Sequence, residues 1–99
     1  MPEKPAADGL EVLRARLDSI DERFLEELRA RIETCVEIAH FKREHDVQMM
    51  QPHRIRIVQD RAARFGEEHG ISQDFLRALY DLIIEETCRV EDMVIGSAP

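Results

Sequence analysis

The chain has 99 residues and a formal net charge of −7 at pH 7, with 21 acidic side chains against 14 Lys and Arg. A chain of this length accommodates one domain, and a domain this small commonly gains stability by dimerising. The acidic balance argues against general nucleic-acid binding, which usually shows a basic domain. It leaves room for a small anionic ligand, because a local cluster of Arg and Lys can oppose the global charge.

The first nine residues, MPEKPAADG, contain two prolines and few apolar groups, so they are predicted to form a disordered leader. They lack the apolar core of a targeting peptide, and no later apolar run approaches the roughly 20 residues of a membrane span. We therefore expect a cytoplasmic protein in which Cys35 and Cys88 are buried thiols.

A long helix is predicted over residues 10–43, which contain neither Pro nor Gly, with Asp8 as a candidate N-terminal cap. Apolar residues recur along it at spacings of three and four, the period of a helix face: Leu10, Leu13, Leu17, Ile20, Phe24, Leu28, Ile32, Cys35, Ile38 and Ala39. Such a helix is about 50 Å long, whereas a compact monomer of this size has a radius of gyration of about 13 Å. The remaining residues cannot cover it, so the pattern indicates a second copy of the chain.

Two further helices are predicted after residues 44–51, where the helical period breaks. The second helix runs from about Pro52 to Glu68, because proline is favoured in a first turn. Gly70 is suited to ending it, and Ser72 is suited to capping the third helix.

Together these elements predict an all-α fold of three helices in the order long, short, long. No strand or internal repeat is apparent. The helical domain is expected over residues 10–95, after a leader over residues 1–9 and before a short tail over residues 96–99.

Three cations lie on or beside the apolar stripe of the first helix: Arg14, Arg31 and Lys42. Arg31 and Lys42 are 11 residues apart, which brings them to within about 20° of one face. Long cations often bury the stem and keep the head in water, but two like charges facing one core repel unless an anion lies between them. Arg14 lies about 100° around the helix from Arg31 and about 25 Å away. It would therefore reach the same ligand only from another subunit, or else serve a different site.

Further candidate site residues lie on the other two helices. Arg54 is at the start of the second helix, where free backbone N–H groups favour an anion. Thr87 and Glu91 are four residues apart and share a face of the third helix. Glu91 is either part of a site or a solvated carboxylate paired with a nearby Arg. The four histidines show no metal-binding spacing and are expected at the surface or in loops: His40, His45, His53 and His69.

These residues resemble the all-helical chorismate mutases. Residues 13–21, LRARLDSID, are similar to the opening pattern L-R-x-x-L-D-x-I-D of that family. Arg31, then VEIAHFK over residues 36–42, Arg54 and LIIEET over residues 82–87 follow in the family's order. The resemblance covers about residues 10–95.

The resemblance implies an intertwined homodimer in which the long first helices cross between subunits and complete shared active sites. It implies an isomerase that performs a Claisen rearrangement without a cofactor or a metal. Arg14 from the partner chain and Arg31 would clamp the two carboxylates of the substrate, and Lys42 would hydrogen-bond its ether oxygen.

The same resemblance assigns roles on the second and third helices. Arg54 would contact the bound dianion, Glu91 would face the ether oxygen, and Thr87 would support a carboxylate. Glu91 can donate a hydrogen bond there only when protonated, which an apolar bundle favours and Lys42 opposes.

The chain departs from many chorismate mutases on either side of Arg54. Gln51 and Ile55 stand where acidic residues help to recognise the ring hydroxyl at C4, and loss of a buried acceptor weakens recognition of a hydroxyl. Residues 49–55 and 88–92 are similar to the 4-amino-4-deoxychorismate mutases of antibiotic pathways, so the amino analogue is the expected substrate. Three alternatives stay open: an ordinary chorismate mutase, an isochorismate pyruvate lyase and a non-catalytic helical dimer.

Overall fold

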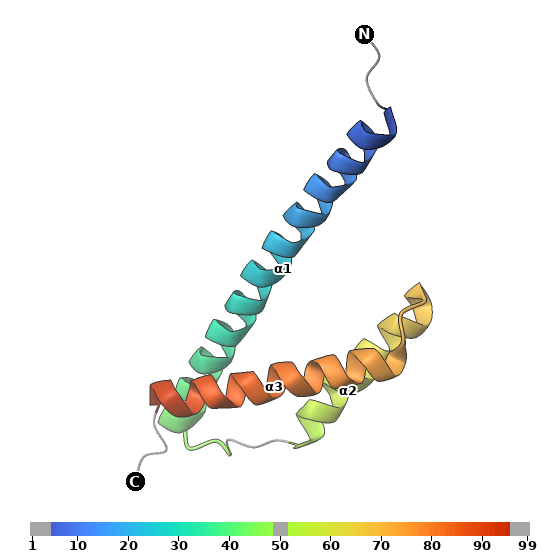
Figure 1. Ribbon diagram of the computed structural model, residues 1–99. Helices are drawn as coiled ribbons and strands as arrows, with labels where there is room; N and C mark the ends of the chain where they lie inside the picture. The colour runs from blue at the N-terminus through green and yellow to red at the C-terminus, as the bar shows by residue number, and fades with distance from the viewer. Residues whose placement is uncertain (1–4, 49–51, 96–99) are drawn as a thin grey trace. The chain divides into compact units, whose positions relative to one another are not determined.

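The computed structural model describes residues 5–48 and 52–95, which form three helices (Figure 1). They are α1 (Pro5–Glu44), α2 (Pro52–His69) and α3 (Gln73–Ile95), and these two described ranges contain no strand. The predicted all-α fold and the order long, short, long are confirmed. None of the helices in this part of the chain has the length and apolar character needed to cross a membrane.

The first helix begins earlier than the sequence predicted. It starts at Pro5, so Pro5–Gly9 of the expected leader are helical and the predicted cap at Asp8 is wrong. Proline fits a first helical turn because its φ is already helical and it has no N–H to leave unpaired, and the two alanines that follow are strong helix formers. The rest of the expected leader, residues 1–4, and the tail over residues 96–99 lie outside the described residues.

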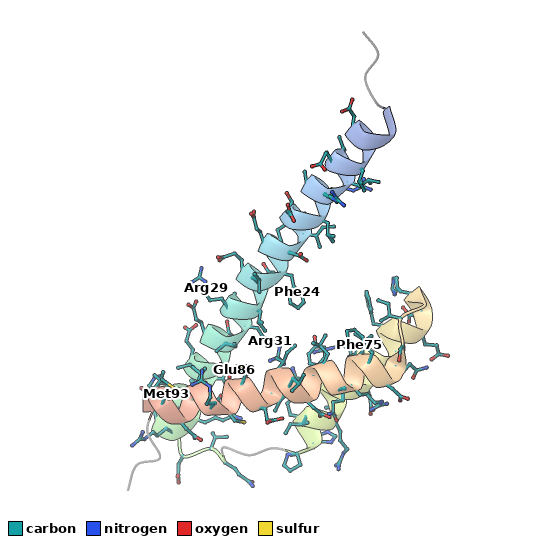
Figure 2. All side chains as sticks on the ribbon, viewed as in Figure 1. Phe24, Arg29, Arg31, Phe75, Glu86 and Met93 are labelled. Carbon is teal, nitrogen blue, oxygen red and sulfur yellow. The ribbon has the colours of Figure 1, made fainter. Side chains whose placement is uncertain are left out.

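The chain divides into two compact units, residues 1–33 and residues 34–99. In the first unit, α1 exposes apolar side chains of the predicted stripe: Leu10, Leu13, Leu17, Ile20 and Phe24. Figure 2 shows Phe24 and Arg29 on opposite sides of this helix. Arg29 pairs with Glu26 at 2.7 Å and with Glu33 at 3.0 Å, as expected of a solvated outer face. Charged side chains on the polar face of this unit thus pair with one another. The apolar side chains on its other face stay exposed.

In the second unit, α2 packs against α3. The buried apolar side chains of the described residues are small: Ala39, Val58, Ala62 and Ala63. Asp81 of α3 accepts a hydrogen bond from Gln59 of α2, and Arg77 of α3 lies 3.2 Å from Asp60 of α2. Small residues allow the helices to approach closely, but they bury little apolar area, so this unit has a thin core.

The turn between α2 and α3 follows the predicted chemistry. Gly70 has a φ of +72°, and the N–H of Ile71 donates to the carbonyl of Gly66 at 2.9 Å, which ends α2. Ser72 then caps α3, because its Oγ accepts a hydrogen bond from the N–H of Phe75 at 3.1 Å. Both predicted roles are confirmed.

Gly70→Ala is expected to destabilise the protein by about 1 kcal/mol, because a Cβ is unfavourable at positive φ. Gly9→Ala is the matched control: Gly9 is helical and has nothing within 4 Å of an added Cβ, so this change should stabilise by about 0.5–1 kcal/mol. Urea denaturation at one fixed chain concentration measures both. Two changes of the same sign would contradict this account of the turn.

Candidate active site

Lys42 and Glu91 both belong to the second unit, where the charge of one acts on the other. Lys42 is in the last turn of α1, and Glu91 lies near the C-terminal end of α3. Both side chains are half-buried, and the charge of Lys42 acts on the carboxyl of Glu91. Two residues that are far apart in the sequence therefore interact electrostatically through space.

The pKa of Glu91 is raised above its ordinary value. Burial is the main cause and the negative charge of Asp92 adds to it, whereas Lys42 lowers the pKa. Because burial prevails, the Glu91 carboxyl keeps its proton to a higher pH than a solvated glutamate does. A protonated carboxyl donates a hydrogen bond, which an ionised one cannot do.

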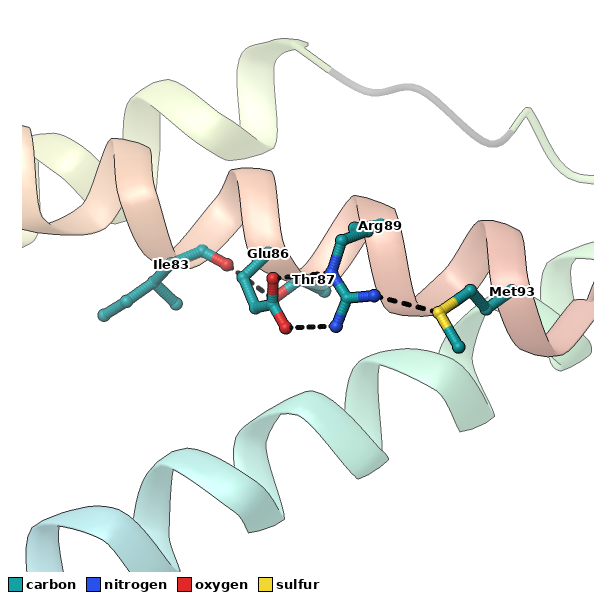
Figure 3. A network of polar contacts seen from close by, with 5 residues as sticks. All are labelled: Ile83, Glu86, Thr87, Arg89 and Met93. Atoms are coloured by element: carbon teal, nitrogen blue, oxygen red, sulfur yellow. Dashed lines mark hydrogen bonds and ion pairs between the residues drawn. The ribbon is translucent and has the colours of Figure 1, made fainter.

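Thr87 lies one turn before Glu91 on α3 and is buried, with 6% of its surface exposed. Its hydroxyl donates to the carbonyl of Ile83 at 2.8 Å (Figure 3). The oxygen keeps its lone pairs, so in this rotamer Thr87 offers an acceptor. It would have to rotate away from Ile83 to donate to a carboxylate.

An exposed polar cluster lies beside Thr87 on α3 (Figure 3). Arg89 donates to both carboxylate oxygens of Glu86, at 2.8 and 2.6 Å, and to the sulfur of Met93 at 2.9 Å. The bond from Arg89 is the main cause that lowers the pKa of Glu86. Glu86 and Glu91 thus have pKa values displaced in opposite directions on one helix, according to whether a bonded cation or burial prevails.

One of the two cysteines, Cys88, lies about one turn before Glu91 on α3. Burial raises the pKa of the Cys88 thiol, and Glu91, Asp92 and Cys35 add to the effect in that order. Both cysteines are half-buried free thiols, so they are less buried than the sequence predicted.

Other predicted site residues lie elsewhere on the chain. Arg14 and Arg31 belong to the first unit, where Arg31 is half-buried and Arg14 is exposed and 3.3 Å from Glu11. In the second unit, Arg54 is exposed in the first turn of α2 and Ile55 beside it is half-buried. The predicted contact at position 51, Gln51, lies outside the described residues.

All four histidines are exposed, as predicted. Within residues 5–48 and 52–95, no three His, Cys, Asp or Glu side chains are grouped so that they could hold a metal ion. The sequence analysis did not predict that His45 and His69 would each stack on a phenylalanine at the ends of α1 and α2. The signal was present, since each follows a phenylalanine by four residues and so stacks on it.

The sequence matches the chorismate mutase type II family over residues 13–92, and the chain belongs to that family. Members of this family are generally dimers. The match confirms the predicted class, an isomerase of the chorismate mutase type.

Two curated relatives are each named 4-amino-4-deoxychorismate mutase. The protein from Streptomyces pristinaespiralis is 53% identical over 92 residues, which are 93% of this chain and 71% of the relative. The protein from Streptomyces venezuelae is 51% identical over 87 residues, which are 88% of this chain and 84% of the relative. No solved structure is significantly similar to the chain.

Proposed function

We propose that this protein rearranges 4-amino-4-deoxychorismate to 4-amino-4-deoxyprephenate, as a cytoplasmic step towards 4-aminophenylalanine or an antibiotic. The observation that carries the proposal is the pair of Lys42 with a Glu91 carboxyl whose pKa is raised by burial. Membership of the family and the names of the two Streptomyces relatives support the choice of reaction and substrate.

The reaction requires neither a nucleophile nor proton transfer. The ether C–O bond breaks as a C–C bond forms within the same molecule, so the protein must hold the enolpyruvyl arm over the ring. Negative charge grows on the ether oxygen as the C–O bond stretches, and fixed donors stabilise it. Lys42 supplies an ammonium N–H and protonated Glu91 supplies an O–H.

Recognition of the two substrate carboxylates falls to the arginines. Arg31 and Arg14 from the partner chain clamp them, while Arg54 contacts the dianion from the start of α2 and Thr87 supports a carboxylate. An arginine fork matches a carboxylate with two parallel hydrogen bonds. The apolar stripe that the first unit leaves exposed supports a homodimer with shared sites.

The choice of the amino substrate rests on the resemblance to the two Streptomyces relatives, and the positions that flank Arg54 depart from those of many chorismate mutases. Ile55 is half-buried and has no side-chain acceptor for a ring hydroxyl. Gln51 offers an amide oxygen that can accept a hydrogen bond from an amine. Both therefore belong to the proposed substrate-binding residues.

Chorismate, 4-amino-4-deoxychorismate and isochorismate are offered to the protein in separate assays. The kcat/KM for 4-amino-4-deoxychorismate is expected to be about tenfold or more above that for chorismate, because the site lacks acidic acceptors for the ring hydroxyl. The product identifies the reaction: aminoprephenate or prephenate is formed by a mutase, and pyruvate with salicylate is formed by a lyase. A wide preference for chorismate would indicate an ordinary chorismate mutase. Pyruvate and salicylate from isochorismate would indicate a lyase, and no turnover of any substrate would indicate a non-catalytic dimer.

The kcat is expected to fall as pH rises through the raised pKa of Glu91, because deprotonation removes the donor. One unit above that pKa, about a tenth of the low-pH kcat should remain. Glu91→Gln should flatten the profile, since an amide donates at every pH. Glu86→Gln, on the exposed face of α3, is the control that should keep the wild-type profile. An unchanged profile in Glu91→Gln would remove Glu91 from the role.

Arg14→Ala and Lys42→Ala should each lose about 10²–10³ in kcat/KM or kcat. When the two variants are unfolded together and refolded as mixed dimers, about a quarter of wild-type activity should return. Half of the dimers are then mixed, and each mixed dimer has one site with both residues intact. No recovery would show that Arg14 serves the site of its own chain.

A further inference from the structure

The last turn of α1 ends in a cap formed by Phe41 and His45. The His45 ring stacks on the Phe41 ring, with centroids 4.0 Å apart and planes 20° from parallel. The Phe41 carbonyl accepts two hydrogen bonds from His45, from the backbone N–H at 3.0 Å and from Nδ1 at 2.9 Å. A carbonyl oxygen can only accept, so Nδ1 is the ring nitrogen that carries the hydrogen.

Lys42 lies inside the turn that this cap closes. Its own carbonyl accepts the N–H of Val47 at 2.8 Å, and Asp46 between them has a φ of +58°. This is the hydrogen-bond pattern that ends many helices, here with an aspartate in the position that glycine usually takes. The backbone on both sides of Lys42 is therefore tied to residues 45–47.

This attachment matters because the last carbonyls of a helix have no partner within the helix, and the final turn frays unless other groups satisfy them. A lysine on a frayed turn points in many directions. Electrostatic stabilisation of a developing charge depends on a donor that is already in place. A cap that keeps this last turn helical thus restricts the orientations of the Lys42 side chain.

We propose that His45 is a positioning residue for Lys42: its hydrogen bond to the Phe41 carbonyl keeps the last turn of α1 helical, so that Lys42 stays directed at the reacting ether oxygen. The Phe41 ring holds the imidazole in the rotamer that makes this bond. The proposal rests on the proposed role of Lys42 in the rearrangement.

The chain contains a second copy of the same cap, which serves as a control. At the end of α2, His69 stacks on Phe65 at 4.0 Å and 20°, and its Nδ1 lies 2.9 Å from the Phe65 carbonyl. The last turn of α2 carries none of the proposed site residues. It leads into the start of α3, and Phe75 there is about 25 Å along the helix from Glu91.

The test compares His45→Ala with His69→Ala in kcat, KM and urea denaturation. Both should lose similar stability, because each breaks the same contacts. His45→Ala should lower kcat about three- to tenfold with KM within about twofold, since the lost donor placement matters most in the transition state. His69→Ala should leave both constants within about twofold. His45→Asn should regain at least about half of the wild-type kcat, because Asn Nδ2 occupies the place of His Nδ1 in the chain of bonds.

Equal kcat values in His45→Ala and His69→Ala would overturn the positioning role, as would an Asn variant no faster than His45→Ala. Lys42→Ala in the same assay separates this outcome from failure of the proposed function. If Lys42→Ala is inactive while the two histidine variants behave alike, only the role of His45 is wrong. If Lys42→Ala keeps the wild-type kcat, the role of Lys42 is wrong and the proposal falls with it.

Discussion

The apolar stripe of α1 is the constraint on which the rest of this protein depends. Between Leu10 and Phe24 the stripe stays exposed, and the second unit buries mainly small side chains such as Ala62 and Ala63. Apolar surface of this extent on a small chain calls for another surface to cover it. The same long helix carries Arg14, Arg31 and Lys42, so in the proposed dimer the contact that stabilises the fold also completes the site.

Opposing effects on one carboxyl connect the fold to the chemistry. Burial raises the pKa of Glu91, and Lys42 lowers it without prevailing. The proposed site thus combines a cation with a carboxyl that keeps its proton to a higher pH than a solvated glutamate does. A site made only of cations would bind the dianion strongly, but in the substrate and in the transition state alike. Donors aimed at the ether oxygen are what distinguish the two.

Much of the fold could be predicted because its signals are local. The helical period located α2 and α3, and Gly70 and Ser72 end and cap them as expected. The predicted start of α1 was wrong because the prolines and the scarcity of apolar groups in residues 1–9 indicated a disordered leader, whereas Pro5 at a first turn favours the helix. The site was predicted less completely: Lys42 and Glu91 were expected to be neighbours only through a family resemblance, and the period of either helix alone does not show it.

The sequence by itself determined the three helices, the turn between α2 and α3, and the family, since these depend on residues within one or two turns of each other and on motif order. The tertiary structure decided the state of individual groups. It set the direction of the Glu91 pKa and left Cys35 and Cys88 half-buried. Desolvation and charge act through space between helices that are distant in the chain, so no local pattern encodes their balance.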